Sequence, residues 1–140
     1  MGYTHSWHKE KELPQDKWDK FIEEAKIVLS DARVLWEEYD KPDTKPVLNG
    51  DMVWFNGIEE DGHETFYFSR VVSDEEFVQK GDDGKYFSFC KTAYKPYDKY
   101  VVRMLVLAEK HFGNAIRVNS DGDWTSIAKA TLYDIENELP

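Results

Sequence analysis

The chain has 140 residues, of which 41% are hydrophobic and 15% aromatic, so it is long and apolar enough for one domain over residues 1–140. Its formal net charge of −10 disfavours nonspecific binding to nucleic acid or to an anionic membrane surface, because such binding needs clustered Lys and Arg. No apolar run reaches the roughly 20 residues of a membrane span, and the start of the chain lacks a signal-peptide pattern. The single cysteine cannot form an internal disulfide, so we expect a cytoplasmic protein.

The first half of the chain predicts a strand, a helix and a hairpin. Residues 3–8 alternate in polarity as a strand does. Pro14 suits the first turn of a helix, and apolar residues within 18–39 follow at three- and four-residue spacing. Residues 52–56 and 65–72 predict two strands joined by an acidic connection with glycines, which favours a hairpin.

The second half of the chain predicts two strands and two helices. Residues 86–89 form a third short strand-like run. Asp98 suits the cap of a helix that is apolar nearly all round and that ends at Gly113, where a left-handed residue is favoured. Residues 115–119 then predict a strand, and 124–139 a final amphipathic helix. We therefore expect an α+β fold, with a mostly antiparallel sheet of about four or five strands packed with three helices.

The segment 90–98 (Cys-Lys-Thr-Ala-Tyr-Lys-Pro-Tyr-Asp) is rich in polar and aromatic side chains for a connection that leads into a helix. Its lysines and threonine suit a phosphate or carboxylate, because unpaired amides face outward at a helix start, and its tyrosines suit stacking on a base. The side chains concerned are Lys91, Thr92, Lys95, Tyr94 and Tyr97. The alternative is that the lysines are solvated, Tyr97 packs on the helix and Asp98 only caps it.

A second group of polar residues lies where the hairpin returns, at His63 and Glu64. A histidine beside a carboxylate can transfer protons near neutral pH, and Asn56 reaches the same region if the two strands pair. The alternative is a turn histidine in water. His63 and Asp98 are therefore the candidate catalytic bases.

Nothing in the sequence supports a metal site or a cofactor. His5 and His8 are three residues apart, so on a strand they point to opposite faces, and no Cys pair or His-Glu-x-x-His spacing is present. Cys90 has no activating neighbour that the sequence can show, and lone cysteines are usually small buried hydrophobes. We predict no metal ligands, no cofactor and a packing role for Cys90.

Several motifs together resemble a family of short uncharacterised proteins of bacteria and their phages, over nearly the whole chain. They are Gly-Tyr-Thr-His-x-Trp at the N-terminus, Phe55–Gly57, His63–Phe66, Cys-Lys-Thr-Ala-x-Lys-Pro-Tyr-Asp at 90–98, and Ser120–Gly122. The family usually has Tyr where this chain has Ser6, and Arg where it has Tyr94. The resemblance names relatives without naming a reaction, and it implies that the polar motif residues converge. The predicted ligand-binding set is Tyr3, His5, Asn56, His63, Lys91, Thr92, Lys95 and Tyr97.

The leading functional hypothesis is a domain that binds a small ligand, either nucleotide-like or another phosphorylated metabolite. Aromatic rings would stack on the ligand while Lys91, Lys95 and nearby amides hold its phosphate. In a phage, as the resemblance implies, such a protein could sequester a host signalling nucleotide. An alternative is a hydrolase or transferase, with His63 or Asp98 as base and Lys91 stabilising negative charge.

A further alternative is an acidic protein–protein interaction module or inhibitor that binds a basic partner, and an oligomer is compatible with the sequence. Steep salt sensitivity of the complex would distinguish this hypothesis, because its attraction would come from exposed charges. The acidic residues concerned are Glu59, Glu60, Asp61, Asp74, Glu75, Glu76, Asp82 and Asp83.

Overall fold

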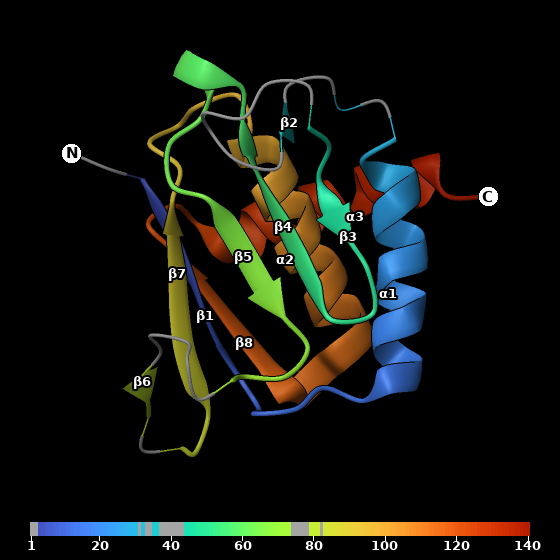
Figure 1. The fold of residues 1–140 in the computed structure, drawn as a ribbon, viewed down its shortest axis with the longest axis vertical. Helices are drawn as coiled ribbons and strands as arrows, with labels where there is room; N and C mark the ends of the chain where they lie inside the picture. The colour runs from blue at the N-terminus through green and yellow to red at the C-terminus, as the bar shows by residue number, and fades with distance from the viewer. Residues whose placement is uncertain (1–2, 31, 33–34, 37–43, 74–78, 82) are drawn as a thin grey trace.

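The computed structural model describes residues 3–30, 32, 35–36, 44–73, 79–81 and 83–140 (Figure 1). This part of the chain contains α-helices together with two antiparallel sheets, which confirms the predicted α+β class. Its helices are α1 (Gln15–Val28), α2 (Asp98–Phe112) and α3 (Trp124–Glu138), with short 3-10 helices η1 (Glu59–Asp61) and η2 (Gly113–Ala115).

The strands are divided between two sheets rather than gathered in one. The first sheet has the order β6 (Gln79–Lys80), β7 (Tyr86–Lys91), β1 (Thr4–Lys9) and β8 (Ile116–Ser120). The second has the order β2 (Leu35–Trp36), β4 (Met52–Gly57) and β3 (Val47–Leu48), with β5 (Phe66–Ser69) also paired to β4.

The N-terminal strand β1 lies inside the first sheet, because it pairs with both β7 and β8. His5 is therefore opposite Cys90 on one side and Ser120 on the other. The predicted alternation is confirmed: His5, Trp7 and Lys9 are buried, while the residues between them are partly exposed. This register places a histidine of the extreme N-terminus beside two segments that are about a hundred residues away in the sequence.

An aromatic core joins the two sheets to the helices. The ring of Trp7 on β1 lies 5.4 Å from that of Phe66 and 5.9 Å from that of Phe68, both on β5. Trp18 of α1 stacks on Phe68 with 5.7 Å between ring centroids. Helix α2 contacts α1, α3 and β8, and Figure 1 shows it behind β4. Its residues from Val101 to Ala108 are all buried, as its apolar pattern predicted.

The predicted helix over 18–39 is too long. Helix α1 ends at Val28, and Ser30 donates its hydroxyl to the Ile27 carbonyl at 2.8 Å. Leu35 and Trp36 instead form β2, which pairs with the end of β4. A run of apolar residues at three- and four-residue spacing fits a helix or two short elements, and only the tertiary partner decides between them. Residues 37–39 of the predicted helix lie outside the described residues.

Several predicted elements are confirmed. The strands predicted over 52–56 and 65–72 overlap β4, which runs one residue further to Gly57, and the shorter β5, and the two pair antiparallel. Gly113 follows α2 with a φ of 54°, a left-handed conformation that glycine adopts at low cost. Asp123 caps α3 by accepting the backbone N–H of Ser126 at 3.4 Å. No helix within the described ranges is long and apolar enough to cross a membrane.

Candidate functional site

The connection between β7 and α2 contains a strained turn. Lys95 donates its backbone N–H to the Thr92 carbonyl at 3.0 Å, and the two residues between them both have positive φ, 53° for Ala93 and 60° for Tyr94. Turns of this kind usually place Asn, Asp or Gly at these positions, and each non-glycine residue held there costs about 1–3 kcal/mol. The Tyr3 carbonyl accepts the N–H groups of Thr92 at 2.9 Å and of Ala93 at 3.3 Å. Tertiary contacts therefore hold a backbone conformation that the local sequence disfavours.

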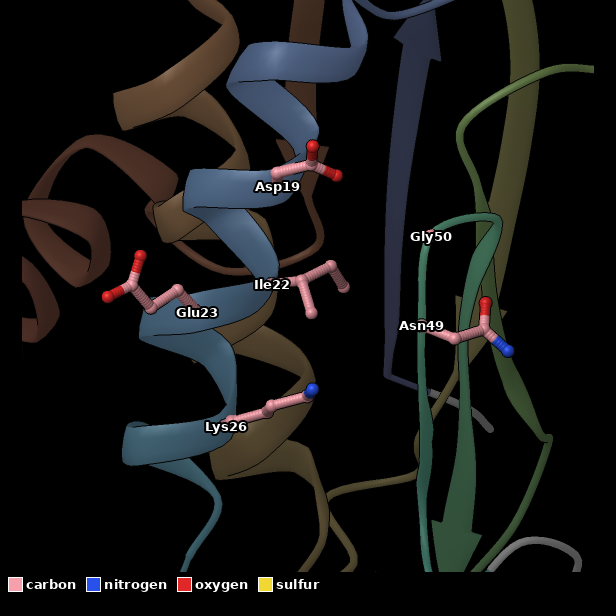
Figure 2. Close-up of a pocket in the computed structure, with 6 residues that line it drawn as sticks. All are labelled: Asp19, Ile22, Glu23, Lys26, Asn49 and Gly50. Carbon is pink, nitrogen blue, oxygen red and sulfur yellow. The ribbon is translucent and has the colours of Figure 1, made fainter.

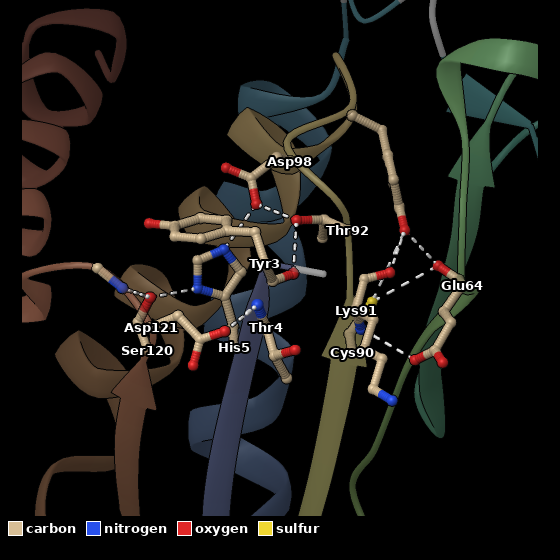
Figure 3. A network of polar contacts seen from close by, with 12 residues as sticks. Tyr3, Thr4, His5, Glu64, Cys90, Lys91, Thr92, Asp98, Ser120 and Asp121 are labelled. Atoms are coloured by element: carbon tan, nitrogen blue, oxygen red, sulfur yellow. Dashed lines mark hydrogen bonds and ion pairs between the residues drawn. The ribbon is translucent and has the colours of Figure 1, made fainter. Parts of the chain in front are cut away.

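A buried polar network lies beneath this turn (Figure 3). His5 is fully buried, and its Nε2 lies 2.6 Å from Asp98 Oδ1 while its Nδ1 lies 2.8 Å from Ser120 Oγ. Thr92 Oγ1 donates to the same Asp98 oxygen. All contacts are consistent with one proton arrangement, in which Nε2–H donates to Asp98 and Nδ1 accepts the Ser120 hydroxyl proton. The network thus links β1, the β7–α2 connection and the end of β8.

Ser, His and Asp also form the catalytic triad of many acyl hydrolases. In this protein the geometry favours a positioning role for His5 instead. A general acid must reach the leaving group, and the His5 ring is fully buried, with Tyr3 at 4.9 Å and Trp124 at 6.2 Å between ring centroids. Ser120 Oγ also accepts the Gly122 N–H at 3.1 Å. We therefore interpret His5 as the residue that fixes Asp98 and, through it, the strained turn.

Asp98 does not act as the predicted helix cap. Tyr97 occupies the N-cap position of α2, no side chain caps the helix there, and Asp98 is the first helical residue. Its carboxylate faces His5 and Thr92 instead. The sequence could not show this, because His5 lies 93 residues away.

Asn56 is buried, with 1% of its surface exposed, and its side-chain amide is fully engaged. Its Oδ1 accepts the N–H of Gly57 at 2.7 Å and of His63 at 3.1 Å, and its Nδ2 donates to the His63 carbonyl and to Thr65 Oγ1. Gly57 and Gly62 approach each other so closely that a Cβ on either would collide with backbone. Asn56 therefore closes the connection from β4 to β5 and orients His63, leaving no polar group for a ligand.

Glu64 joins the β4–β5 connection to the end of β7. Its Oε1 accepts the Lys91 N–H at 2.9 Å, and its own N–H donates to the Lys91 carbonyl at 3.2 Å. The Tyr97 hydroxyl donates to the Glu64 carbonyl at 2.5 Å. Tyr97 is fully buried, so its ring presents no surface on which a ligand could stack. Two polar segments from different sheets are thus held side by side.

A surface pocket of about 400 Å³ opens where these segments meet. Among the described residues it is lined by Glu60, Gly62, His63 and Lys95. It therefore brings together two predicted ligand-binding residues, one from the β4–β5 connection and one from the β7–α2 connection. Gly62 was not predicted as a site residue, and Glu60 was named only among the acidic residues of the interaction-module alternative, although both lie close to His63 in the sequence.

The other predicted residues lie outside this pocket. Lys91 is exposed, and its ammonium lies 5.7 Å from the centroid of the Phe89 ring. The remaining five predicted residues are all buried, and the most exposed of them, Tyr3, has 7% of its surface exposed. They are Tyr3, His5, Asn56, Thr92 and Tyr97.

A second pocket, of about 350 Å³, lies between α1 and the turn from β3 to β4 (Figure 2). Its lining contains none of the predicted site residues and mixes both signs of charge. The lining residues are Asp19, Ile22, Glu23, Lys26, Asn49 and Gly50. This pocket has no polar network comparable to that of His5 and carries no functional hypothesis.

We expect alkaline pH to destabilise the fold partly through Cys90. Burial raises the pKa of its thiol from 9.0 to about 12, against the opposing hydrogen bond with Tyr97. The unfolded chain therefore releases this proton at lower pH than the folded chain. The contribution of the Cys90 thiol to the free energy of unfolding is complete below pH 9. It is lost at about 1.4 kcal/mol per pH unit as the pH rises toward 12.

Urea unfolding from about pH 8 to about pH 10 tests this contribution. Cys90→Ala lacks the thiol and should show a shallower loss of stability with pH than the unsubstituted protein. Equal slopes in the two proteins would contradict the prediction. Burial also raises the pKa of Tyr97 above its ordinary 10.0, and Cys90 adds to that rise, so the two slopes are compared below about pH 10, where the Tyr97 hydroxyl stays protonated in both proteins.

The described residues contain no group of three or more His, Cys, Asp or Glu side chains that could hold a metal ion. No protein-family model matches the chain, and no curated protein and no solved structure shows significant similarity to it. The candidate site is therefore defined by its geometry: a strained turn over a buried network, next to a pocket lined by His63 and Lys95.

Proposed function

We propose that this protein binds a small phosphorylated ligand in the pocket lined by His63 and Lys95. The observation that carries the proposal is the meeting of these two side chains, from connections of different sheets, in one pocket. Lysine offers a compact positive charge with three donors, and histidine offers a ring N–H near neutral pH, which together suit phosphate oxygens.

The third polar side chain of the pocket refines the ligand class. Glu60 is an exposed carboxylate beside the two donors, and a carboxylate only accepts hydrogen bonds. A bare phosphate would be repelled by Glu60, whereas a ligand that also carries hydroxyl groups can donate to it. A phosphorylated sugar or a nucleotide therefore fits this pocket better than inorganic phosphate.

The position of Lys95 supports binding because its backbone is already ordered. Lys95 closes the turn that the Tyr3 carbonyl and the His5–Asp98–Thr92 contacts hold in place. A ligand that meets a fixed backbone loses less affinity to ordering the site than one that must organise a flexible loop. Ligand binding by Lys95 would explain why the protein has a strained turn that packing of the core does not require.

Lys95→Ala should weaken binding of ribose 5-phosphate by about 10- to 100-fold, because a charge-assisted contact to phosphate is lost. Isothermal titration calorimetry measures this directly. The matched control is Lys99→Ala, which removes the same charge from an exposed position on α2, outside the pocket. Equal affinities in both variants and the unsubstituted protein would remove Lys95 from the site. A loss with Lys91→Ala alone would move the site to the end of β7.

A hydrolase or transferase acting on the same ligand is the second candidate. The observation that favours it is the exposure of His63 in the pocket that also contains Lys95, where a base would face a bound phosphate ester. Mass spectrometry of ribose 5-phosphate and nucleoside phosphates after incubation with the protein separates turnover from binding. Products that disappear with His63→Gln would support catalysis, and ligands recovered intact would support binding alone.

A further inference from the structure

Tyr94 presents an ordered aromatic ring to solvent immediately before Lys95. The side chain is 75% exposed, yet its ring stacks on that of Tyr3 with 3.9 Å between centroids and 17° between planes. Tyr3 itself is buried and packs edge-on against His5. One face of the Tyr94 ring is therefore supported by a fixed neighbour, and most of the remaining ring surface is open.

The backbone at this position makes the exposed ring harder to explain by packing alone. Tyr94 has a φ of 60°, directly after Ala93 at 53°. Glycine or asparagine would form such a turn at lower cost, and a core residue would bury its ring. Here the protein holds a tyrosine in a disfavoured conformation and leaves three quarters of it in water. A side chain of this kind fits a binding surface for a flat ring.

We propose that Tyr94 stacks on the planar base of a nucleotide whose phosphate is bound by Lys95 and His63. This inference rests on the proposed phosphate site and narrows its ligand class to nucleotides. Tyr94 does not line the pocket, but it directly precedes Lys95, which does, with about 3.8 Å between their Cα atoms. In a nucleotide the sugar separates the base from the phosphate, so the ligand would extend out of the pocket to reach the Tyr94 ring. Every base has a π-face, so stacking on Tyr94 tolerates any base. We therefore expect nucleotides in general to bind more tightly than a sugar phosphate that lacks a base.

Calorimetry with adenosine, ribose 5-phosphate and the four ribonucleoside 5′-monophosphates tests this role. The unsubstituted protein should bind the nucleotides about 5- to 100-fold more tightly than ribose 5-phosphate. Tyr94→Ala should lower nucleotide affinity to that of ribose 5-phosphate and leave the latter unchanged. Tyr94→Phe, which keeps the ring, should retain the preference. Circular dichroism checks that both variants fold.

The outcomes separate this inference from the proposed phosphate site. A nucleotide preference that survives Tyr94→Ala, or no preference in the unsubstituted protein, would overturn the role of Tyr94 while leaving the phosphate site intact. Binding of adenosine that needs Tyr94, without any effect of Lys95→Ala on the nucleotides, would keep the stacking surface and overturn the phosphate site. Absence of binding by all these compounds would overturn both.

Discussion

Asp98→Ala is expected to destabilise the fold by about 2–4 kcal/mol, because it leaves the fully buried His5 Nε2–H without an acceptor and leaves the Thr92 hydroxyl only its longer contact to the Tyr3 carbonyl. His5 Nε2 lies 2.6 Å from the carboxylate, and Thr92 Oγ1 donates to the same oxygen. His5 and Thr92 are both fully buried, and of the three residues only Asp98 borders on solvent, with 21% of its side chain exposed. The loss should appear as a lower urea midpoint, followed by tryptophan fluorescence, with an unchanged dependence on denaturant.

The matched control is Asp98→Asn, which keeps an oxygen of the same shape in reach of His5. It should lose about 1 kcal/mol, since a neutral acceptor replaces a charged one. His5→Ala combined with Asp98→Ala should cost less than the sum of the two single changes, because each removes the same contact. Additive effects, or an Asp98→Ala protein as stable as Asp98→Asn, would show that the network contributes little to the fold.

Asp98→Ala should also affect the pocket, through the turn between Thr92 and Lys95. Its positive φ values at Ala93 and Tyr94 are unfavourable in an isolated chain and persist only where surrounding contacts fix them. Without the Asp98 carboxylate, Thr92 loses one of these contacts. Ligand affinity should therefore fall together with stability in Asp98→Ala, even though Asp98 does not line the pocket.

Local periodicity was sufficient for most of the secondary structure. The alternation of β1 and the apolar surface of α2 each depend on the residues of the element itself, and both are confirmed. The end of α1 could not be predicted in this way. Leu35 continues the helical spacing of the preceding residues, and it forms a strand because β4 offers it a partner, Gly57. Pairing between distant residues is not contained in a local pattern.

The sequence predicted which polar segments come together, but not which of their residues are buried and which line a pocket. The polar segments around His63 and 90–98 do lie side by side, yet Thr92 and Tyr97 are buried while Lys95 lines a pocket. Whether a polar residue faces a ligand or another part of the chain depends on partners that are distant in sequence. For Thr92 these partners are Tyr3, which directly precedes β1, and Asp98, the first residue of α2.

Asn56→Ala is expected to have an effect of similar size, about 3–4 kcal/mol, because one buried amide supplies four hydrogen bonds. The N–H of Gly57 would lose its acceptor in a buried contact, and the N–H of His63 would lose it in a partly buried one. Each buried donor left unpaired costs about 1–3 kcal/mol, and the cavity adds to this. Urea unfolding measures the loss, and amide hydrogen exchange should show faster exchange at both residues.

Asn49→Ala provides a matched control for the same type of side chain in water. Asn49 Oδ1 accepts the N–H groups of Asp51 at 2.9 Å and Met52 at 3.0 Å, but the residue is exposed, so solvent can replace its contacts. It should therefore lose only about 1 kcal/mol or less. Equal losses in the two variants would mean that burial of Asn56 adds nothing to its hydrogen bonds. If Asn56 orients His63 as the contacts indicate, Asn56→Ala should also weaken ribose 5-phosphate binding, whereas Asn49→Ala should leave it unchanged.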